Sequence, residues 1–228
     1  MRTQLFSLIS TIRVVGLAIA AFAMWLFATL AEDVLDKETH ALDTAILLAL
    51  QRIHTPLLDQ VMEGITFLGE PDVLLVVSLL LGGILLWRNH RSQATILAIA
   101  GVGAVGLNYW LKILFARDRP ALWDRVIDVR FYSFPSGHAM ISFAIYGAIA
   151  YLAITHYPRW RWIIIAFTSL LVLAIGFSRL YFGVHWPTDI VAGYTAGLIW
   201  LIACIFSREV WRTYRGLEQS PTEQMKSS

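Results

Sequence analysis

The chain has 228 residues, of which 57% are hydrophobic and 15% are charged, and its mean hydropathy is +0.63. These values exclude an ordinary soluble domain and predict a protein that crosses a membrane several times. The formal net charge of +2 is too small to indicate nucleic-acid binding, and the single cysteine excludes a disulfide framework.

The apolar segments predict an all-α fold, a bundle of six transmembrane helices in a polytopic membrane protein. In chain order the predicted crossings are 14–31, 72–87, 95–115, 137–155, 162–177 and 187–206. The first follows two arginines and is long for the apolar region of a signal peptide, so we expect it to be retained. Residues 1–228 are expected to form a single membrane-embedded domain that ends in a polar cytoplasmic tail at 207–228.

Residues 41–53, after the first crossing, predict a short amphipathic helix lying in the membrane interface. Its apolar positions recur at helical spacing and are Leu42, Ala45, Ile46, Ala49, Leu50 and Ile53, flanked by Asp43, Gln51 and Arg52. Residues 57–68 are read either as a second interfacial helix or as the start of the next crossing. Gly69-Glu70-Pro71 then marks a break.

The third crossing contains Gly101, Gly103 and Gly106 in a GxGxxG pattern. No strand precedes this pattern, which lies inside an apolar helix, so a dinucleotide site is rejected. Close packing of helices on small residues is the better explanation, and it also applies to Gly193 and Gly197.

An even number of crossings places both termini on one side. That side carries most of the basic turns, so it is expected to be cytoplasmic, in an inner (cytoplasmic) membrane. The opposite face has a local cluster of cations where cations are disfavoured: Lys112, Arg117, Arg119, Arg125, Arg130 and Arg179. This cluster predicts a binding site for an anion.

The first motif is Lys112 with Arg119-Pro120. A spacing of seven is nearly two helical turns, so both cations lie on about the same face as far as the helix runs. Pro120 disfavours helix at Arg119 and releases its guanidinium, whose planar fork suits phosphate oxygens. Snorkelling cations at a helix end remain an alternative for this pair.

The second motif is Pro135-Ser136-Gly137-His138, at the start of the fourth crossing. Ser136 is a candidate N-cap, and Gly137 allows a ligand to approach the exposed N–H groups of the helix start. His138 then lies beside the bound anion. The alternative is an ordinary capped helix with an interfacial histidine.

The third motif runs from Ser178-Arg179 to His185 and Asp189. Pro187 suits the first turn of a helix, which places His185 just before that helix and Asp189 about one turn inside it. The carboxylate can accept a hydrogen bond from one ring nitrogen and leave the other free to attack a substrate. An interfacial histidine followed by an aspartate at a helix N-terminus is the open alternative.

Together the three motifs look like the signature of the type 2 phosphatidic acid phosphatase superfamily, in its bacterial membrane-integrated branch. Every position of that signature is filled between residues 112 and 189, and the six-crossing layout extends the resemblance. The resemblance implies a membrane lipid phosphatase that acts on a lipid phosphomonoester or diphosphate, such as phosphatidate, phosphatidylglycerophosphate or undecaprenyl diphosphate. The partners it implies are this lipid phosphate and the bilayer.

The resemblance also implies the roles of the residues. His185 is the nucleophile that forms a phosphohistidine, Asp189 orients it, and His138 protonates the leaving group and later activates water. The residues implied to hold the phosphoryl oxygens are Lys112, Arg119, Ser136, Gly137 and Arg179. No metal or other cofactor is expected, because the aspartates of the loop lack a paired ligand pattern and cations would repel a metal.

Three alternatives remain. A lipid phosphotransferase of the same fold would pass the phosphoryl group to an acceptor other than water. A vanadate-dependent oxidase of this fold would be soluble, unlike this chain. An anion transporter would carry polar residues near the membrane midplane, whereas the charged groups here gather at one face.

Overall fold

The computed structural model of the chain describes residues 2–123 and 131–224, with side chains described within 14–123 and 131–210. All regular elements in these ranges are helical, as the sequence predicts. They are α1 (Arg2–Leu35), α2 (His40–Gln51), α3 (Pro56–Phe67), α4 (Pro71–Trp87), α5 (Arg91–Phe115), α6 (Gly137–His156), the 3₁₀ turn η1 (Pro158–Trp160), α7 (Arg161–Tyr181) and α8 (Pro187–Gln224). The polar segment predicted as a tail thus continues as helix to Gln224.

Five helical segments of the described chain are long and apolar enough to cross a membrane: Val14–Leu35, Arg91–Phe115, Gly137–His156, Pro158–Tyr181 and Pro187–Val210. The sixth predicted crossing is built differently. At 17 residues α4 is only about 25 Å long, short for a bilayer. It joins α3 at a bend of 46°, and only the two together are long and apolar enough for a sixth, broken crossing, so the described residues have five such segments or six.

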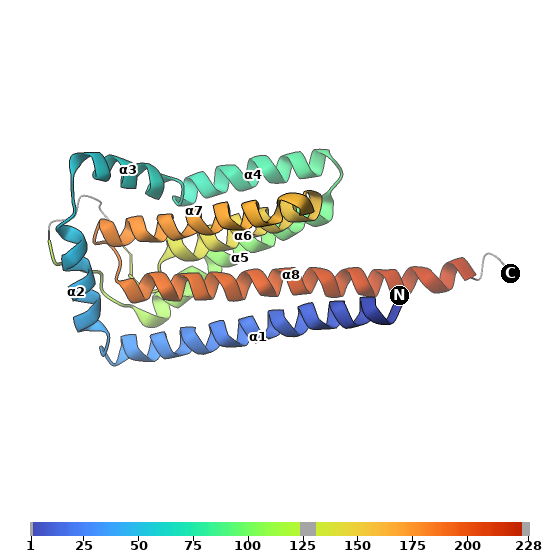
Figure 1. Cartoon of the computed structure of the whole chain (residues 1–228), viewed down its shortest axis with the longest axis horizontal. Coiled ribbons are helices and arrows are strands. Elements are labelled where there is room, and N and C mark those ends of the chain that lie inside the picture. The colour runs from blue at the N-terminus through green and yellow to red at the C-terminus, as the bar shows by residue number, and fades with distance from the viewer. Residues whose placement is uncertain (1, 124–130, 225–228) are drawn as a thin grey trace.

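The helices run along one another, with both termini toward one end of the bundle and α2 lying across the other end (Figure 1). The connection from α4 to α5 and the turn η1 lie at the terminal end. The connection from α5 to α6 and the turn from α7 to α8 lie at the α2 end. The three motifs of the sequence are therefore brought to a single end of the bundle.

The central helix is α6, which packs against α5, α7 and α8. Its approach to α8 is close because two glycines of α8 face its backbone. A Cβ added at Gly193 would lie 2.8 Å from the Ser136 carbonyl oxygen, and one at Gly197 would lie 2.7 Å from that of Met140. The predicted packing on small residues is confirmed at both positions.

The GxGxxG pattern lies inside α5, as predicted. Gly103 faces the ring of Trp200 on α8, where a Cβ would overlap the indole. Gly106, in contrast, has no described atom within 4 Å of its Cβ position. Close packing therefore explains Gly103 but not Gly106.

The amphipathic helix predicted at 41–53 corresponds to α2, and its two faces are informative. The apolar face is turned outward, with Leu42 64% exposed and Ile53, just beyond the helix, 47% exposed. The face that contacts α7 and α8 buries Leu47 and the carboxylate of Asp43, which is 1% exposed. The sequence placed Asp43 on the polar flank of this helix, and the structure shows that this flank is buried against the protein while the apolar positions Leu42 and Ile53 are exposed.

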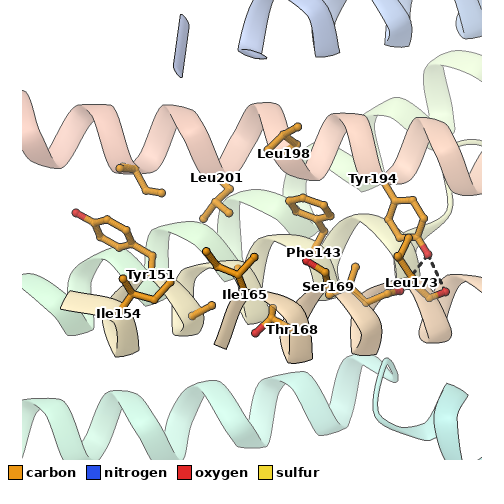
Figure 2. A pocket seen from close by; sticks show the side chains of 14 residues that line it. Phe143, Tyr151, Ile154, Ile165, Thr168, Ser169, Leu173, Tyr194, Leu198 and Leu201 are labelled. Carbon is orange, nitrogen blue, oxygen red and sulfur yellow. Dashed lines mark hydrogen bonds between the residues drawn. The ribbon is translucent and has the colours of Figure 1, made fainter. Parts of the chain in front are cut away.

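An apolar groove of about 480 Å³ separates α7 from α8 on the outer surface of the bundle. In Figure 2 its floor is formed by α6, and its walls carry Leu173 and Ile165 on one side and Leu198 and Leu201 on the other. The hydroxyl of Tyr194 donates to backbone carbonyls of α7, 3.0 Å from Val172 and 3.1 Å from Leu173. The groove has room for hydrocarbon but holds none of the predicted site residues.

Candidate active site

The three motifs meet at the end of the bundle that α2 crosses. Ala116, in the left-handed conformation with φ of 43°, ends α5 one turn after Lys112 and turns the chain inward. The second motif opens α6, and the third lies at the end of α7 and the start of α8. A backbone hydrogen bond of 3.0 Å from Ser136 N to the Asp189 carbonyl ties the second motif to the third.

His185 and Asp189 form the predicted pair. His185 lies in the turn before α8, and its Nδ1 is 3.3 Å from Asp189 Oδ2, within the first turn of that helix. Both side chains are buried, at 2% and 0% exposure. A buried carboxylate held in this position orients the imidazole and fixes which nitrogen carries the proton.

Three more donors hold the Asp189 carboxylate. Oδ2 accepts hydrogen bonds from Trp186 N at 2.8 Å and from the Ser133 hydroxyl. Oδ1 accepts one from Arg117 NH1 at 2.7 Å. The carboxylate therefore has little freedom, and a rigid orienting group is what the predicted role requires.

The second ring nitrogen of His185 faces the guanidinium of Arg119. Nε2 lies 3.2 Å from Arg119 NH1, which also donates to the Val184 carbonyl at 2.7 Å. Because arginine can only donate, Nε2 is the acceptor, and the proton of the neutral ring is assigned to Nδ1 facing Asp189. The lone pair of Nε2 thus points toward the arginine side of the site.

Burial lowers the pKa of His185 well below its ordinary value of 6.5, and the positive charges of Arg119, Lys112 and Arg179 lower it further. The lowered pKa favours the unprotonated ring at neutral pH, which is the form that the predicted nucleophile role requires.

This lowered pKa predicts the acid limb of the activity. The proposed attack requires the unprotonated ring. As the pH is lowered, kcat/KM should therefore fall through protonation of His185 only well below pH 6.5. Arg119→Gln removes a nearby positive charge, so it should raise the pKa of His185 and move the acid limb toward higher pH. It should also lower the rate. Profiles of kcat/KM between about pH 5 and pH 8 check this, and the same limb position in both proteins would contradict it.

The three cations predicted to hold phosphate are all at this end. Lys112 Nζ donates to the carbonyls of Tyr132 and Ser133, the latter at 3.3 Å. Arg179 is 1% exposed, and its NH1 donates to the Thr66 hydroxyl at 2.7 Å. Of the three, Arg119 contacts the His185 ring directly, and the charges of Lys112 and Arg179 act on it as well.

Three buried polar atoms of the predicted site have no hydrogen-bond partner among the described residues: Ser136 Oγ, His138 Nε2 and Arg179 Nε. Ser136 is the N-cap residue of α6, as predicted, but its hydroxyl makes no capping bond. Leaving buried donors unpaired is costly. Oxygen atoms of a bound phosphoryl group would satisfy them.

The sequence profile of the PAP2 superfamily matches residues 92–212, more than half of the chain. The chain belongs to the PAP2 superfamily. Phosphatidylglycerophosphatase B of Bacillus subtilis (strain 168) is 33% identical to it over 177 residues, 76% of this chain and 86% of that protein. Undecaprenyl-diphosphatase of Sulfolobus acidocaldarius is 34% identical over 122 residues, 50% of this chain and 54% of that protein.

The fold agrees with this membership. The crystal structure of a transmembrane PAP2 type phosphatidylglycerolphosphate phosphatase from Bacillus subtilis superposes with a TM-score of 0.79. It is 27% identical in sequence, and the match covers 83% of this chain and 96% of that one. The resemblance inferred from the three motifs is confirmed at the level of family and fold.

Beside these PAP2 motifs the structure reveals a buried charge network that the sequence did not. Arg117 joins two carboxylates, with NH1 2.7 Å from Asp189 Oδ1 and NH2 2.8 Å from Asp43 Oδ2. Asp43 also accepts from Thr188, at 3.2 Å from its backbone nitrogen and 2.7 Å from its hydroxyl. Asp43 therefore stabilises the N-terminus of α8, where an anion is favoured, and α2 is tied to the orienting carboxylate.

The break between α3 and α4 also contributes polar groups to the site. The sequence analysis interpreted this segment only as a break between helices. Besides Thr66, it supplies Glu70, whose Oε1 lies 3.2 Å from His138 Nε2 and 3.9 Å from Arg179 NH1. We call residues 66–70 the α3–α4 corner. Its proximity to the PAP2 motifs depends on the bend between the two helices.

Within the described residues no group of three or more His, Cys, Asp or Glu side chains is arranged to hold a metal ion. Arg125 and Arg130, counted in the cation cluster, and Asp124 and Asp128 of the same loop lie outside the described residues.

Proposed function

We propose that this chain is a membrane lipid phosphatase that releases phosphate from a lipid phosphate ester or diphosphate through a phosphohistidine intermediate. The observation that carries the proposal is a buried neutral imidazole, His185, oriented by Asp189 and surrounded by cations beside unpaired buried donors. The names of its relatives, phosphatidylglycerophosphatase B and undecaprenyl-diphosphatase, support a lipid substrate.

In the first step Nε2 of His185 attacks phosphorus, forming an N–P bond as the bond to the leaving oxygen breaks. His138 gives its proton to that oxygen, so the lipid leaves as an alcohol or as a protonated phosphate. Asp189 stabilises the positive charge that develops on the His185 ring. Phosphoryl transfer depends mainly on positioning and charge neutralisation, and Lys112, Arg119 and Arg179 supply both.

In the second step water attacks phosphorus and the N–P bond breaks, which regenerates His185. His138, now unprotonated, takes the proton of the water, and inorganic phosphate leaves. Fixed guanidinium and ammonium groups take the place that Mg²⁺ occupies in kinases, so the reaction is proposed to need no metal.

We further propose that the protein lies in the cytoplasmic membrane with both termini in the cytoplasm and the site at the outer face. The terminal end of the bundle carries the basic residues Arg88, Arg91, Arg159, Arg161 and Arg208. Such residues favour the cytoplasmic side. The opposite end carries the PAP2 motifs, where an amphiphile can present its headgroup while its tail stays in the bilayer.

The test is release of inorganic phosphate by the purified full-length protein from phosphatidate, phosphatidylglycerophosphate and undecaprenyl diphosphate in mixed micelles containing EDTA. The proposal expects turnover of at least one of them, undiminished by EDTA and inhibited by vanadate, which mimics the pentacoordinate phosphorus. Activity that EDTA abolishes would exclude the metal-independent mechanism. Transfer of the phosphoryl group to an alcohol in preference to water would make the protein a phosphotransferase.

A further inference from the structure

The α3–α4 corner is packed directly on the ring of His138. A Cβ added at Gly69 would lie 2.4 Å from Ile175 Cγ2 and 3.1 Å from His138 Cδ2, so a side chain here would displace its neighbours. The Leu68 carbonyl accepts from Tyr146 OH of α6 at 2.7 Å, and Thr66 accepts from Arg179. These contacts fix the corner from both sides, and the residue that follows Gly69 has a defined position.

That residue is Glu70, in the N-cap position of α4, where its side chain makes no capping bond. Its carboxylate turns instead toward the site, with Oε1 3.2 Å from His138 Nε2 and 3.9 Å from Arg179 NH1. The side chain is 41% exposed, whereas that of Arg179 is 2% exposed. Glu70 is thus a partly exposed carboxylate at the edge of the site, with Oε1 toward the buried side chains of His138 and Arg179.

The position of His138 next to Glu70 places this carboxylate near the leaving group in the proposed mechanism. In the proposed mechanism His138 protonates the oxygen of the leaving group, and its buried Nε2 is the ring nitrogen that faces Glu70. The leaving oxygen must therefore approach the place where the carboxylate lies. Glu70 marks the side of the site from which the lipid portion of the substrate departs.

We propose that Glu70 determines substrate class, by making the site selective for lipid phosphomonoesters over lipid diphosphates. This inference rests on the proposed function and deepens it.

The reason is the charge of the leaving group. In a monoester the leaving oxygen is bonded to carbon, and no further negative charge lies beside it. In a diphosphate the same oxygen is bonded to a second phosphorus, whose own oxygens carry negative charge and would lie next to the Glu70 carboxylate. Like charges at this distance repel, and the repulsion is stronger in a partly buried site than in water. An unfavourable contact with the wrong substrate is an established source of specificity.

A competing explanation is that Glu70 only orients His138, as Asp189 orients His185. The two explanations differ in a measurable way. A residue that only orients the general acid affects every substrate alike, whereas a residue that repels a second phosphate affects diphosphates selectively.

The test uses farnesyl phosphate and farnesyl diphosphate in detergent micelles, because these probes share one tail and differ only in the second phosphate. Phosphate release by the full-length protein gives kcat/KM for each, and the selectivity is their ratio. Glu70→Gln keeps the size of the side chain and removes its charge. We expect the ratio of diphosphate to monophosphate to rise about tenfold or more relative to wild type. Glu63→Gln, which removes an exposed charge from the neighbouring helix α3, should leave the ratio unchanged.

An unchanged ratio in Glu70→Gln, with both substrates slowed equally, would overturn the inference and leave Glu70 as a positioning residue. If Gln is not tolerated, Glu70→Ser removes the same charge and can cap α4 through its hydroxyl, so it carries the same test. Failure of the wild-type protein to release phosphate from either probe, and from the lipids named above, would instead refute the proposed function.

Discussion

Replacing His185 by alanine is expected to abolish phosphate release while the helical bundle stays folded. His185 combines a buried imidazole with a carboxylate at one ring nitrogen and a guanidinium at the other. The loss should be in kcat, by several orders of magnitude, since removal of a covalent nucleophile leaves only residual catalysis from binding and charge. Phosphate release and acid-labile phosphoenzyme, trapped by alkaline quenching of labelled lipid phosphate, are the two measurements.

The fold should survive because Asp189 keeps its bonds from Trp186, Ser133 and Arg117 when the ring is removed. Thermal unfolding in detergent checks this point. His90→Ala is a suitable control, since this exposed histidine lies at the far end of the bundle, and it should retain full activity. If the folded His185→Ala protein still formed labelled phosphoenzyme, the nucleophile would be a residue other than His185.

The second large effect is expected at Arg117. Arg117→Gln leaves the carboxylates of Asp43 and Asp189, 1% and 0% exposed, without their shared cation. Breaking a buried ion pair by removing one partner costs about 3–5 kcal/mol. Activity should fall as well, by about 10- to 100-fold in kcat with KM less affected, because the Asp189 carboxylate loses the donor on Oδ1.

A set of variants separates these two effects. Arg117→Lys keeps the charge but cannot reach two carboxylates with separate nitrogens, so we expect partial rescue. Asp43→Asn should cost less than Arg117→Gln, since Arg117 then still pairs with Asp189. The double variant should be less destabilised than the sum of the single changes, because it leaves one unpaired carboxylate and not two. Denaturation midpoints measure the effect on stability, and kcat measures the effect on the reaction. Additive effects of the single changes would refute the shared-cation arrangement.

The sequence was sufficient for the parts of the site that depend on local chain geometry. Pro187 sets the start of α8, so the spacing of His185 and Asp189 predicted their pairing, although it left an ordinary helix N-terminus as an alternative. The crossings followed from hydropathy, and their number placed the three motifs at one end. The exception is α4, which is too short to span alone and joins α3 at a bend.

The parts that sequence reading missed depend on tertiary contacts. Arg117 was counted as one more cation, because nothing local indicates that it joins two buried carboxylates. Asp43 was placed on a polar flank because periodicity identifies the apolar face of a helix but not whether that face meets protein or lipid. Glu70 follows a turn signal, and only the 46° bend brings it to His138.

The orientation of α2 has a mechanical consequence. The helix whose exposed side is apolar is also the one whose Asp43 pairs with Arg117, so two ion pairs in series connect that surface to the proposed nucleophile. A shift of α2 with bilayer thickness or headgroup packing would pull on the carboxylate paired with His185. Lipid packed against α2 would then influence the proposed reaction through these ion pairs and not only as a solvent.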